Sequence, residues 1–396
     1  MKKCMFGLLI LSLFLSGCWD RRELNELAIT MAIGIDKVED EYQVTTQVIV
    51  PSELSMKGGL GRSPVTLFQA KGDTVYEAIR KLTRDSPRKI YPGHLRMLVI
   101  GEELAKEGIA DSLELMFRDR ELRYDFYIAI AKDMTAAEIL NVTTTIEAIP
   151  ANKMINALET SEKAFASTSG VTLDDLVADL VSDGKEAVLT GIFVTGDQEI
   201  GPSKQNVESI TPSARIRYDN FAVFKKDKLV GWLTERESRG YNDITNKVKT
   251  TVNTISCPKE GKATIEVIKF NSDVKGKINK GKAEVDVNIK VKGNVGEVEC
   301  EIDLTKPETI DQLEKIYEKD LKEIISDTIN TVQNKYETDI FGFGEAIHRS
   351  NPKEWNKMKE NWDEEFSNLT VNVKVVMELQ HTGTITNSFL EEIKDK

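Results

Sequence analysis

The chain has 396 residues, of which 40% are hydrophobic and 30% are charged, with 53 Lys and Arg against 65 Asp and Glu. This composition is typical of a globular protein and excludes a disordered chain or a collagen-like fibre, and the length predicts two or three domains. The net charge of −12 argues against nucleic-acid binding, since such a protein would repel the phosphate backbone.

The first 18 residues have the organisation of an export signal. Two lysines precede an apolar run over residues 5–15, which ends in Leu-Ser-Gly-Cys at 15–18. The run is shorter than the roughly 20 residues of a membrane-spanning helix, so we predict a signal peptide over 1–17. Leu-Ser-Gly-Cys also matches the bacterial lipobox, in which a lipid is attached to the cysteine thiol. The sequence therefore predicts lipidation of Cys18; the alternative is an ordinary signal whose cleavage site contains a cysteine.

A lipid anchor would determine where the mature protein lies. A lipoprotein anchor carries at least two acyl chains, which makes attachment stable, so we expect the protein on the outer face of a membrane. Removing residues 1–17 deletes two lysines and no acidic residue, which leaves a net charge of −14. Because an anionic bilayer repels an acidic body, we expect the anchor rather than a charged patch to hold it there.

Two cysteines remain in the exported body, Cys257 and Cys300. An oxidising compartment favours a disulfide between them, and the alternative is a pair of free thiols that act as small hydrophobic side chains. The three histidines are isolated from each other and from any cysteine. No metal-binding spacing is present, so the sequence predicts neither a metal site nor a cofactor.

Residues 18–200 mix strands with helices, which predicts an α+β region. Thr74 and Glu77 have the spacing of a capping box at the start of a helix. Residues 51–64 are rich in glycine, proline and serine and predict a surface loop, not a phosphate-binding cradle. The predicted strands are 28–36, 42–50, 95–100, 124–132 and 187–195, and later helices are 136–140, 152–165 and 173–181.

A polar stretch with glycine and proline at 196–212 predicts a domain boundary. We expect residues 213–396 to form a second α+β domain, with a long helix over 309–336 that covers a mainly antiparallel sheet. The predicted strands are a hairpin at 221–233 followed by 247–256, 263–270, 283–291, 296–302 and a final strand at 370–380.

The start of the mature chain, CWDRRELNELA at 18–28, resembles the Ger(x)C family, the lipoprotein C subunits of spore germinant receptors. The resemblance covers almost the whole chain in the order of the family. It continues through IGID at 33–36, GHLR at 93–96, FRD at 117–119, FAVF at 221–224, GWL at 231–233, FGFG at 341–344 and NPKEW at 351–355.

This resemblance implies a fold and a function. The fold is a multi-domain, three-part α+β body, in which residues 53–92 form a smaller subdomain. The function is that of a non-enzymatic subunit which assembles with receptor A and B subunits in the spore inner membrane and responds to nutrients to start germination. Of the family's functional residues, only Cys18 carries over. The competing hypothesis is a lipoprotein that captures a nutrient itself.

Two further patterns each have more than one interpretation. The alternating charges at 117–123 indicate a solvated helix end, a partner surface or an acid/base site. Trp355 and Trp362, seven residues apart, indicate either core packing or an aromatic patch that faces a partner. Trp19 follows the predicted lipidated cysteine, where tryptophan is suited to the headgroup level of a membrane.

Overall fold

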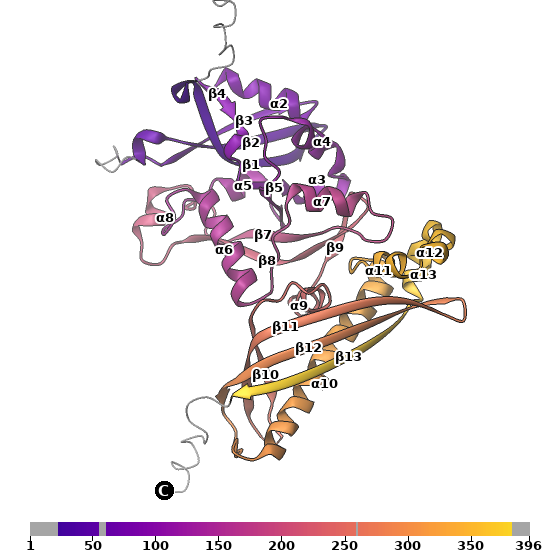
Figure 1. Ribbon diagram of the computed structural model, residues 1–396. Coiled ribbons are helices and arrows are strands. Elements are labelled where there is room, and N and C mark those ends of the chain that lie inside the picture. Colours follow the sequence, from indigo (N-terminus) through magenta and orange to yellow (C-terminus); the bar gives the residue numbers. More distant parts are fainter. Residues whose placement is uncertain (1–22, 55–60, 259, 382–396) are drawn as a thin grey trace, which may run out of the picture.

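The computed structural model describes residues 23–54, 61–258 and 260–381. The predicted signal peptide, Cys18 and Trp19 lie outside the described residues. The described chain folds as α+β around two sheets, with the first sheet in the N-terminal half and the second in the C-terminal half (Figure 1). The predicted fold class is therefore confirmed.

The first sheet has nine strands in the order β3-β2-β1-β5-β6-β7-β8-β9, with β4 paired to β1. Its centre, from β1 to β7, is parallel, and the strands on both sides are antiparallel. The strands are β1 Leu27–Val38, β2 Glu41–Ile49, β3 Val65–Gly72, β4 Lys89–Tyr91, β5 Met97–Gly101, β6 Tyr127–Ala131, β7 Val188–Gly196, β8 Ala214–Lys225 and β9 Lys228–Trp232.

Helices cover both faces of this sheet, which makes it the middle of three layers. Successive residues of β5 enter opposite cores: Leu98 packs with the helices of one face, and Val99 with those of the other. All five residues of β5 are buried. One face carries α2 Val75–Lys81, α3 Glu102–Glu107, α4 Ala110–Arg118 and α7 Leu173–Leu180; the other carries α5 Ala136–Leu140 and α6 Pro150–Ala164.

The helix start predicted at Thr74 is confirmed, because it depends on side chains that are close in sequence. The Thr74 hydroxyl accepts a hydrogen bond from the Glu77 amide at 3.1 Å, at the start of α2. Gly108, which separates α3 from α4, has φ of 139°, a conformation that glycine adopts readily. The edge strand β3 was not predicted, because its residues are mostly exposed or half-buried and lack a strong apolar pattern.

The stretch at 196–212 connects two strands of the same sheet. It contains the short helix α8 (Lys204–Glu208) and joins β7 to β8, which pair antiparallel. The first sheet therefore continues past residue 213 and ends with β9. A polar connection between two paired strands has the same composition as a linker between domains, so composition alone does not distinguish the two. Residues 53–92 likewise supply β3, α2 and β4 to the first sheet and its cover. The division into domains stays a prediction.

The second sheet has four strands in the order β10-β11-β12-β13. They are β10 Thr251–Ser256, β11 Lys262–Asn279, β12 Lys282–Val298 and β13 Thr370–His381. The sheet is mixed and not wholly antiparallel: β13 pairs parallel with β12, since the helices between them return the chain to the same end. The strand expected at 283–291 and the beginning of the one expected at 296–302 form the single long strand β12, and residues 299–302 lie beyond its end.

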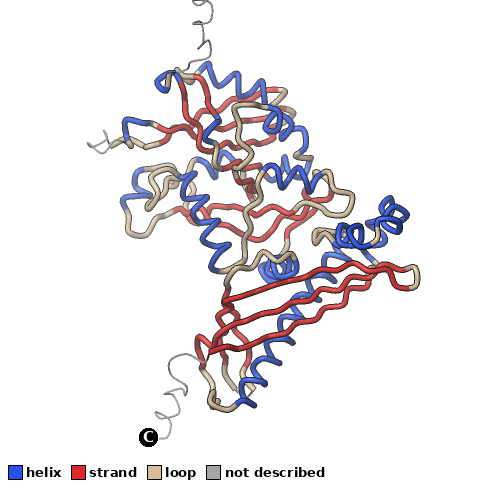
Figure 2. The backbone as a smooth tube through the Cα atoms, viewed as in Figure 1, coloured by secondary structure: helices blue, strands red, loops and turns tan. Residues whose placement is uncertain are grey.

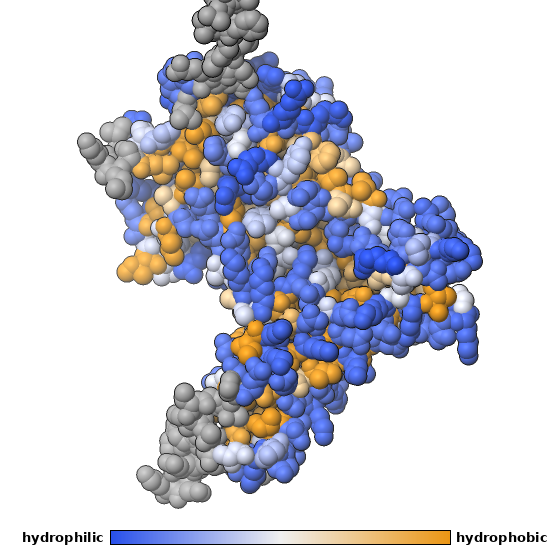
Figure 3. Space-filling view, in the orientation of Figure 1, coloured by the Kyte–Doolittle hydropathy of each residue, from blue (hydrophilic) through white to orange (hydrophobic). Residues whose placement is uncertain are grey.

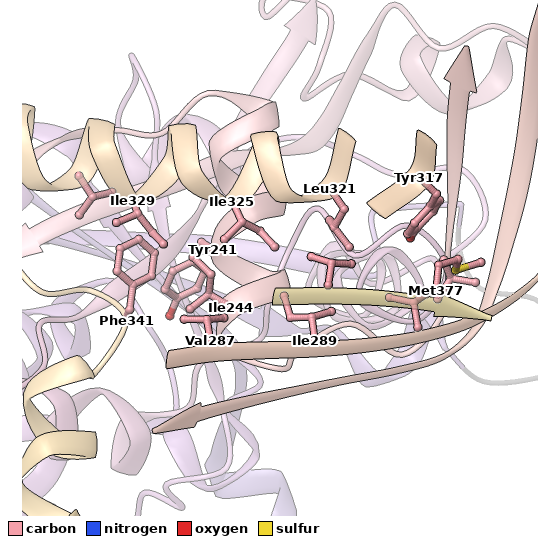
Figure 4. Packing of buried hydrophobic residues seen from close by; sticks show 14 of the residues in the cluster. Tyr241, Ile244, Val287, Ile289, Tyr317, Leu321, Ile325, Ile329, Phe341 and Met377 are labelled. Atoms are coloured by element: carbon pink, nitrogen blue, oxygen red, sulfur yellow. The ribbon is translucent and has the colours of Figure 1, made fainter. Parts of the chain in front are cut away.

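One long helix, α10 (Pro307–Thr331), covers the second sheet on one face, as the periodicity predicted. Tyr317, Leu321 and Ile325 point from it toward Ile289 and Met377 of the sheet (Figure 4). A π-helical turn at Val332–Tyr336 ends it. The remaining helices of this half are α9 Glu235–Ile244, α11 Phe343–Ser350, α12 Pro352–Met358 and α13 Trp362–Ser367; the tube in Figure 2 shows the last three gathered at one end of the sheet.

Candidate functional site

The two sheets meet at a tight backbone contact between glycines. A Cβ added to Gly344 would lie 2.7 Å from the Gly184 Cα and 2.7 Å from the Trp355 ring. Gly184 precedes β7 of the first sheet, and Gly344 lies in α11. We call the first sheet with its covering helices the first unit, and the second sheet with α9 to α13 the second unit. Only residues without a side chain permit this approach. We call this contact and its surroundings the joint.

Asp339 organises the second-sheet side of the joint. Its carboxylate accepts hydrogen bonds from the amides of Phe341 at 3.0 Å, Gly342 at 3.0 Å and Gly344 at 2.8 Å. The indole of Trp362 donates a fourth bond at 3.1 Å. Burial raises the pKa of Asp339 to about 6, while these donors oppose the rise by stabilising the carboxylate. The Asp339 side chain therefore fixes the chain path through the FGFG motif.

Side chains also connect the two units around this contact. The Tyr336 hydroxyl donates to the Trp232 carbonyl at 2.6 Å, and the Ser182 hydroxyl donates to Glu345 at 3.0 Å. Two ion pairs cross the joint as well. They are Lys225–Asp363 at 2.9 Å and Lys359–Asp183 at 3.1 Å. Because the ion pairs are partly exposed and the two hydrogen bonds only partly buried, the glycine contact and the apolar core shared by the two units hold the joint more strongly.

Several motifs singled out in the sequence meet at this joint. GWL at 231–233, FGFG at 341–344 and NPKEW at 351–355 all lie there. Trp355 and Trp362 are 2% and 5% exposed and pack edge to face with ring centroids 5.1 Å apart. The core interpretation of this pair is therefore confirmed, and these motifs position the two sheets against each other.

The IGID motif at 33–36 also has a positioning role. Asp36 is 2% exposed and accepts hydrogen bonds from the Ala136 and Ala137 amides, at 2.7 and 3.0 Å, at the start of α5. Burial raises the pKa of this carboxyl, and the two amides oppose that rise. Asp36 thus ties a central strand to the helix that covers it.

The charged cluster at 117–123 lies at the end of α4. Phe117 stacks on Tyr124 with ring centroids 5.3 Å apart, and the Arg118 Nε donates to Glu114 at 2.7 Å. Lys89 pairs with Glu121 at 2.6 Å. These contacts are exposed or partly exposed, which agrees with a solvated helix end.

Cys257 and Cys300 come together in the structure as a disulfide, with Cα atoms 6.4 Å apart. Cys257 directly follows β10, and Cys300 lies two residues beyond β12, so the bond links two strands that flank β11. Their separation of 43 residues makes this a long-range connection. We predict that the two thiols form this disulfide in the mature protein.

Among the described residues, no group of three or more His, Cys, Asp or Glu is arranged to hold a metal ion. Within the same part of the chain, no helix is both long and apolar enough to cross a membrane. On α9, the buried Asp243 carboxylate lies 3.9 Å from the Arg239 guanidinium. Arg239 also lines a surface pocket with Glu235 and Arg236 of the same helix.

Comparison with known proteins identifies the family. Residues 20–194 match the family described as spore germination protein N-terminal domain, and residues 219–383 match spore germination B3/GerAC like, C-terminal. The chain is 32% identical to spore germination protein KC of Bacillus subtilis over 405 residues, covering all of this chain and 99% of that protein. The chain belongs to the Ger(x)C family of spore germination proteins.

Other Ger(x)C proteins match over nearly their full length. Spore germination proteins A3 and B3 of Bacillus subtilis are 27% and 24% identical and cover 96% and 94% of this chain, and 97% and 96% of their own lengths. The crystal structure of the GerBC protein superposes with a TM-score of 0.53 at 21% identity and covers 88% of this chain and 96% of that one. This likeness shows a shared fold.

Sequence reasoning missed one surface feature of this Ger(x)C protein. A groove of about 580 Å³ opens where β1 and β3 begin and β2 ends. Apolar side chains of these strands line it, and Arg88 lies at its rim. We call it the N-terminal groove. Its residues come from four separate segments of the chain, so no local sequence motif predicts the groove.

Proposed function

We propose that this Ger(x)C protein is the lipid-anchored C subunit of a nutrient germinant receptor and acts by binding and assembly with the A and B subunits. The observation that carries the proposal is the match to spore germination proteins along the entire chain. The lipobox ending at Cys18 supports attachment to the outer face of the spore inner membrane.

The geometry supports a role in assembly. The motifs shared with the family at 231–233, 341–344 and 351–355 are used to hold the two sheets in one orientation. A subunit that presents surfaces from both sheets to its partners requires such a fixed arrangement, because relative motion would separate the two parts of the surface.

Lipidation is tested by growing the spore-forming host with radioactive fatty acid. The Cys18→Ala variant is expected to lose the label and to leave the membrane fraction. Cys4→Ala is the matched control, because Cys4 lies in the segment that cleavage removes. Retained label in Cys18→Ala would place the lipid on another residue.

Assembly is tested by purifying membrane complexes in mild detergent through a tag on this chain. The A and B subunits are expected to copurify. Recovery of this chain alone would contradict the assembly role.

The competing function, direct nutrient capture, is tested by isothermal titration of the mature chain with germinants. Micromolar binding would favour capture.

A further inference from the structure

The end of the molecule at which the described chain begins combines an apolar groove with basic side chains. The groove lining includes Ile29, Ile49, Val50 and Phe68, all only half-buried. Hydrophobic surface is visible at this end of the molecule, beside the entering chain (Figure 3). Half-exposed apolar residues gathered in a concave surface are typical of a binding site.

The segment next to this groove is basic. Residues 80–96 contain six Lys or Arg and one acidic residue. Strand β4 of this segment pairs parallel with the beginning of β1, so that Lys89 lies opposite Leu27. Arg80, Arg84 and Arg88 are exposed, and Arg88 lines the groove itself. Lys81 and Lys89 form ion pairs with Glu77 and Glu121, so the positive charge at the N-terminal groove itself comes from Arg88.

The opposite end of the molecule has the opposite charge. Helix α10 contains seven Asp or Glu and three Lys. Figure 1 shows this helix far from the point where the chain enters. Screening at physiological salt limits charge interactions in water to about 8–10 Å, so the remote acidic end does not cancel the attraction of the basic end for an anion.

The anchor would hold this end close to the bilayer. Five peptide units separate Cys18 from Glu23, and a fully extended chain spans at most about 3.6 Å per residue, so the linker reaches roughly 18 Å. Asn25, two residues further on, already lines the groove. A lipid attached at Cys18 therefore keeps the groove within reach of the membrane surface.

We propose that this end is a membrane-docking face, and that the occupant of the N-terminal groove is an anionic phospholipid of the bilayer. The phosphate would lie against Arg84 and Arg88, and the upper part of the acyl chains against the apolar lining. The inference rests on the proposed lipid anchor at Cys18. It replaces the expectation that the acidic protein is simply repelled by the bilayer, because basic groups near an anionic leaflet are attracted to it.

The test uses the lipidated mature chain reconstituted into vesicles. A fluorophore is placed on Thr66→Cys, at the exposed rim of the groove, or on Lys319→Cys, on the remote helix α10. The vesicles carry phospholipids with brominated acyl chains, which quench fluorescence at short range. Quenching at position 66 is expected to exceed that at position 319 by roughly twofold or more, and to increase when phosphatidylglycerol is added.

Charge reversal separates lipid docking from simple proximity. Arg84→Glu with Arg88→Glu is expected to abolish the increase caused by phosphatidylglycerol. The matched control is Lys315→Glu with Lys322→Glu, at exposed positions of α10, which is expected to retain it. All four side chains are exposed, so these variants are expected to fold normally.

The outcomes distinguish this inference from the proposed function. Flotation with the vesicles but equal quenching at both positions would overturn lipid docking and leave the anchor intact. Quenching at position 66 that is lost when the A and B subunits are present would assign the groove to a protein partner and also overturn the inference. Failure of the wild-type chain to float would overturn the anchor, and the docking argument with it.

Discussion

The two sheets of this protein are buried in different ways. Strands in the centre of the first sheet have helices on both faces, so Leu98 and Val99, adjacent in β5, are both inaccessible to solvent. The second sheet has α10 on one face only, and in β13 Val375 is 9% exposed while its neighbour Val376 is 42% exposed. A continuous apolar run thus indicates burial on two faces, and alternation indicates burial on one.

The two units also share apolar side chains at the joint. Val188, Phe221 and Val223 of β7 and β8 lie in the same buried core as residues of the second sheet and its helices. The rings of Phe221 and Tyr241 pack edge to face with centroids 5.1 Å apart. Beside this shared core, glycines allow close backbone approach and Asp339 organises a loop, so the joint combines apolar packing with a fixed chain path.

The largest effect is expected at the joint. Asp339→Ala leaves three buried amides and the Trp362 indole without their acceptor, so it is expected to lower the free energy of unfolding by about 3–5 kcal/mol. Urea unfolding measures this change. Asp363→Ala, which removes an exposed partner of Lys225 across the same joint, is the control and is expected to cost about 1 kcal/mol or less. Equal losses in both variants would show that Asp339 does not organise the joint.

Polar substitution distinguishes two-sided from one-sided burial. Leu98→Asn and Val99→Asn are each expected to cost on the order of 3 kcal/mol, because each places an unpaired amide in a dry core. In β13, Val375→Asn is expected to be destabilising and Val376→Asn to stay within about 0.5 kcal/mol. Urea unfolding measures the free energy of unfolding of each variant. A tolerated Val99→Asn or a costly Val376→Asn would contradict the layer assignment.

The disulfide belongs only to the second unit. Replacing both Cys257 and Cys300 with alanine is expected to cost about 2–3 kcal/mol, since the bond restricts the unfolded chain over a long loop. Thiol counting on the denatured, unreduced mature protein is expected to find no free thiol. Two free thiols would reject the bond, and reductant would then have no effect on stability.

A dependence of stability on pH is expected within the second unit. Burial raises the pKa of Asp243 to about 7, and Arg239 opposes the rise. The folded protein therefore binds this proton more tightly than the unfolded chain, so stability is lost as the pH rises from about 4 to about 7. Asp243→Asn removes this term, and its stability relative to wild type is expected to improve over that range.

The pH series requires comparison of variant and wild type at each pH. Burial also raises the pKa of Glu186 to about 7 and that of Asp339 to about 6, so both contribute a decline of the same sign. The difference between the two proteins isolates Asp243, while Asp286, whose pKa is lowered mainly by a hydrogen bond from Lys277, serves as a control in Asp286→Asn. A constant difference between Asp243→Asn and wild type would contradict the buried-proton argument.

Much of the local structure could be predicted because its causes are close in sequence. The capping box at Thr74 and the apolar stripe of α10 each depend on residues within a few turns. The edge strand β3 was missed because its side chains are largely solvated. The single strand β12 was divided in two because Gly293 and Gly296 have the composition of a turn.

The sequence by itself determined the α+β class, the long covering helix and membership of the Ger(x)C family, and it predicts the export signal and the lipidation of Cys18, because these depend on short patterns and their order. Only the tertiary structure decided that β8 and β9 complete the first sheet, that Gly184 meets Gly344, and that four separate segments form the N-terminal groove. The physical reason is that strand pairing and backbone contact join residues far apart in the chain, where no periodicity or spacing records which partner is chosen.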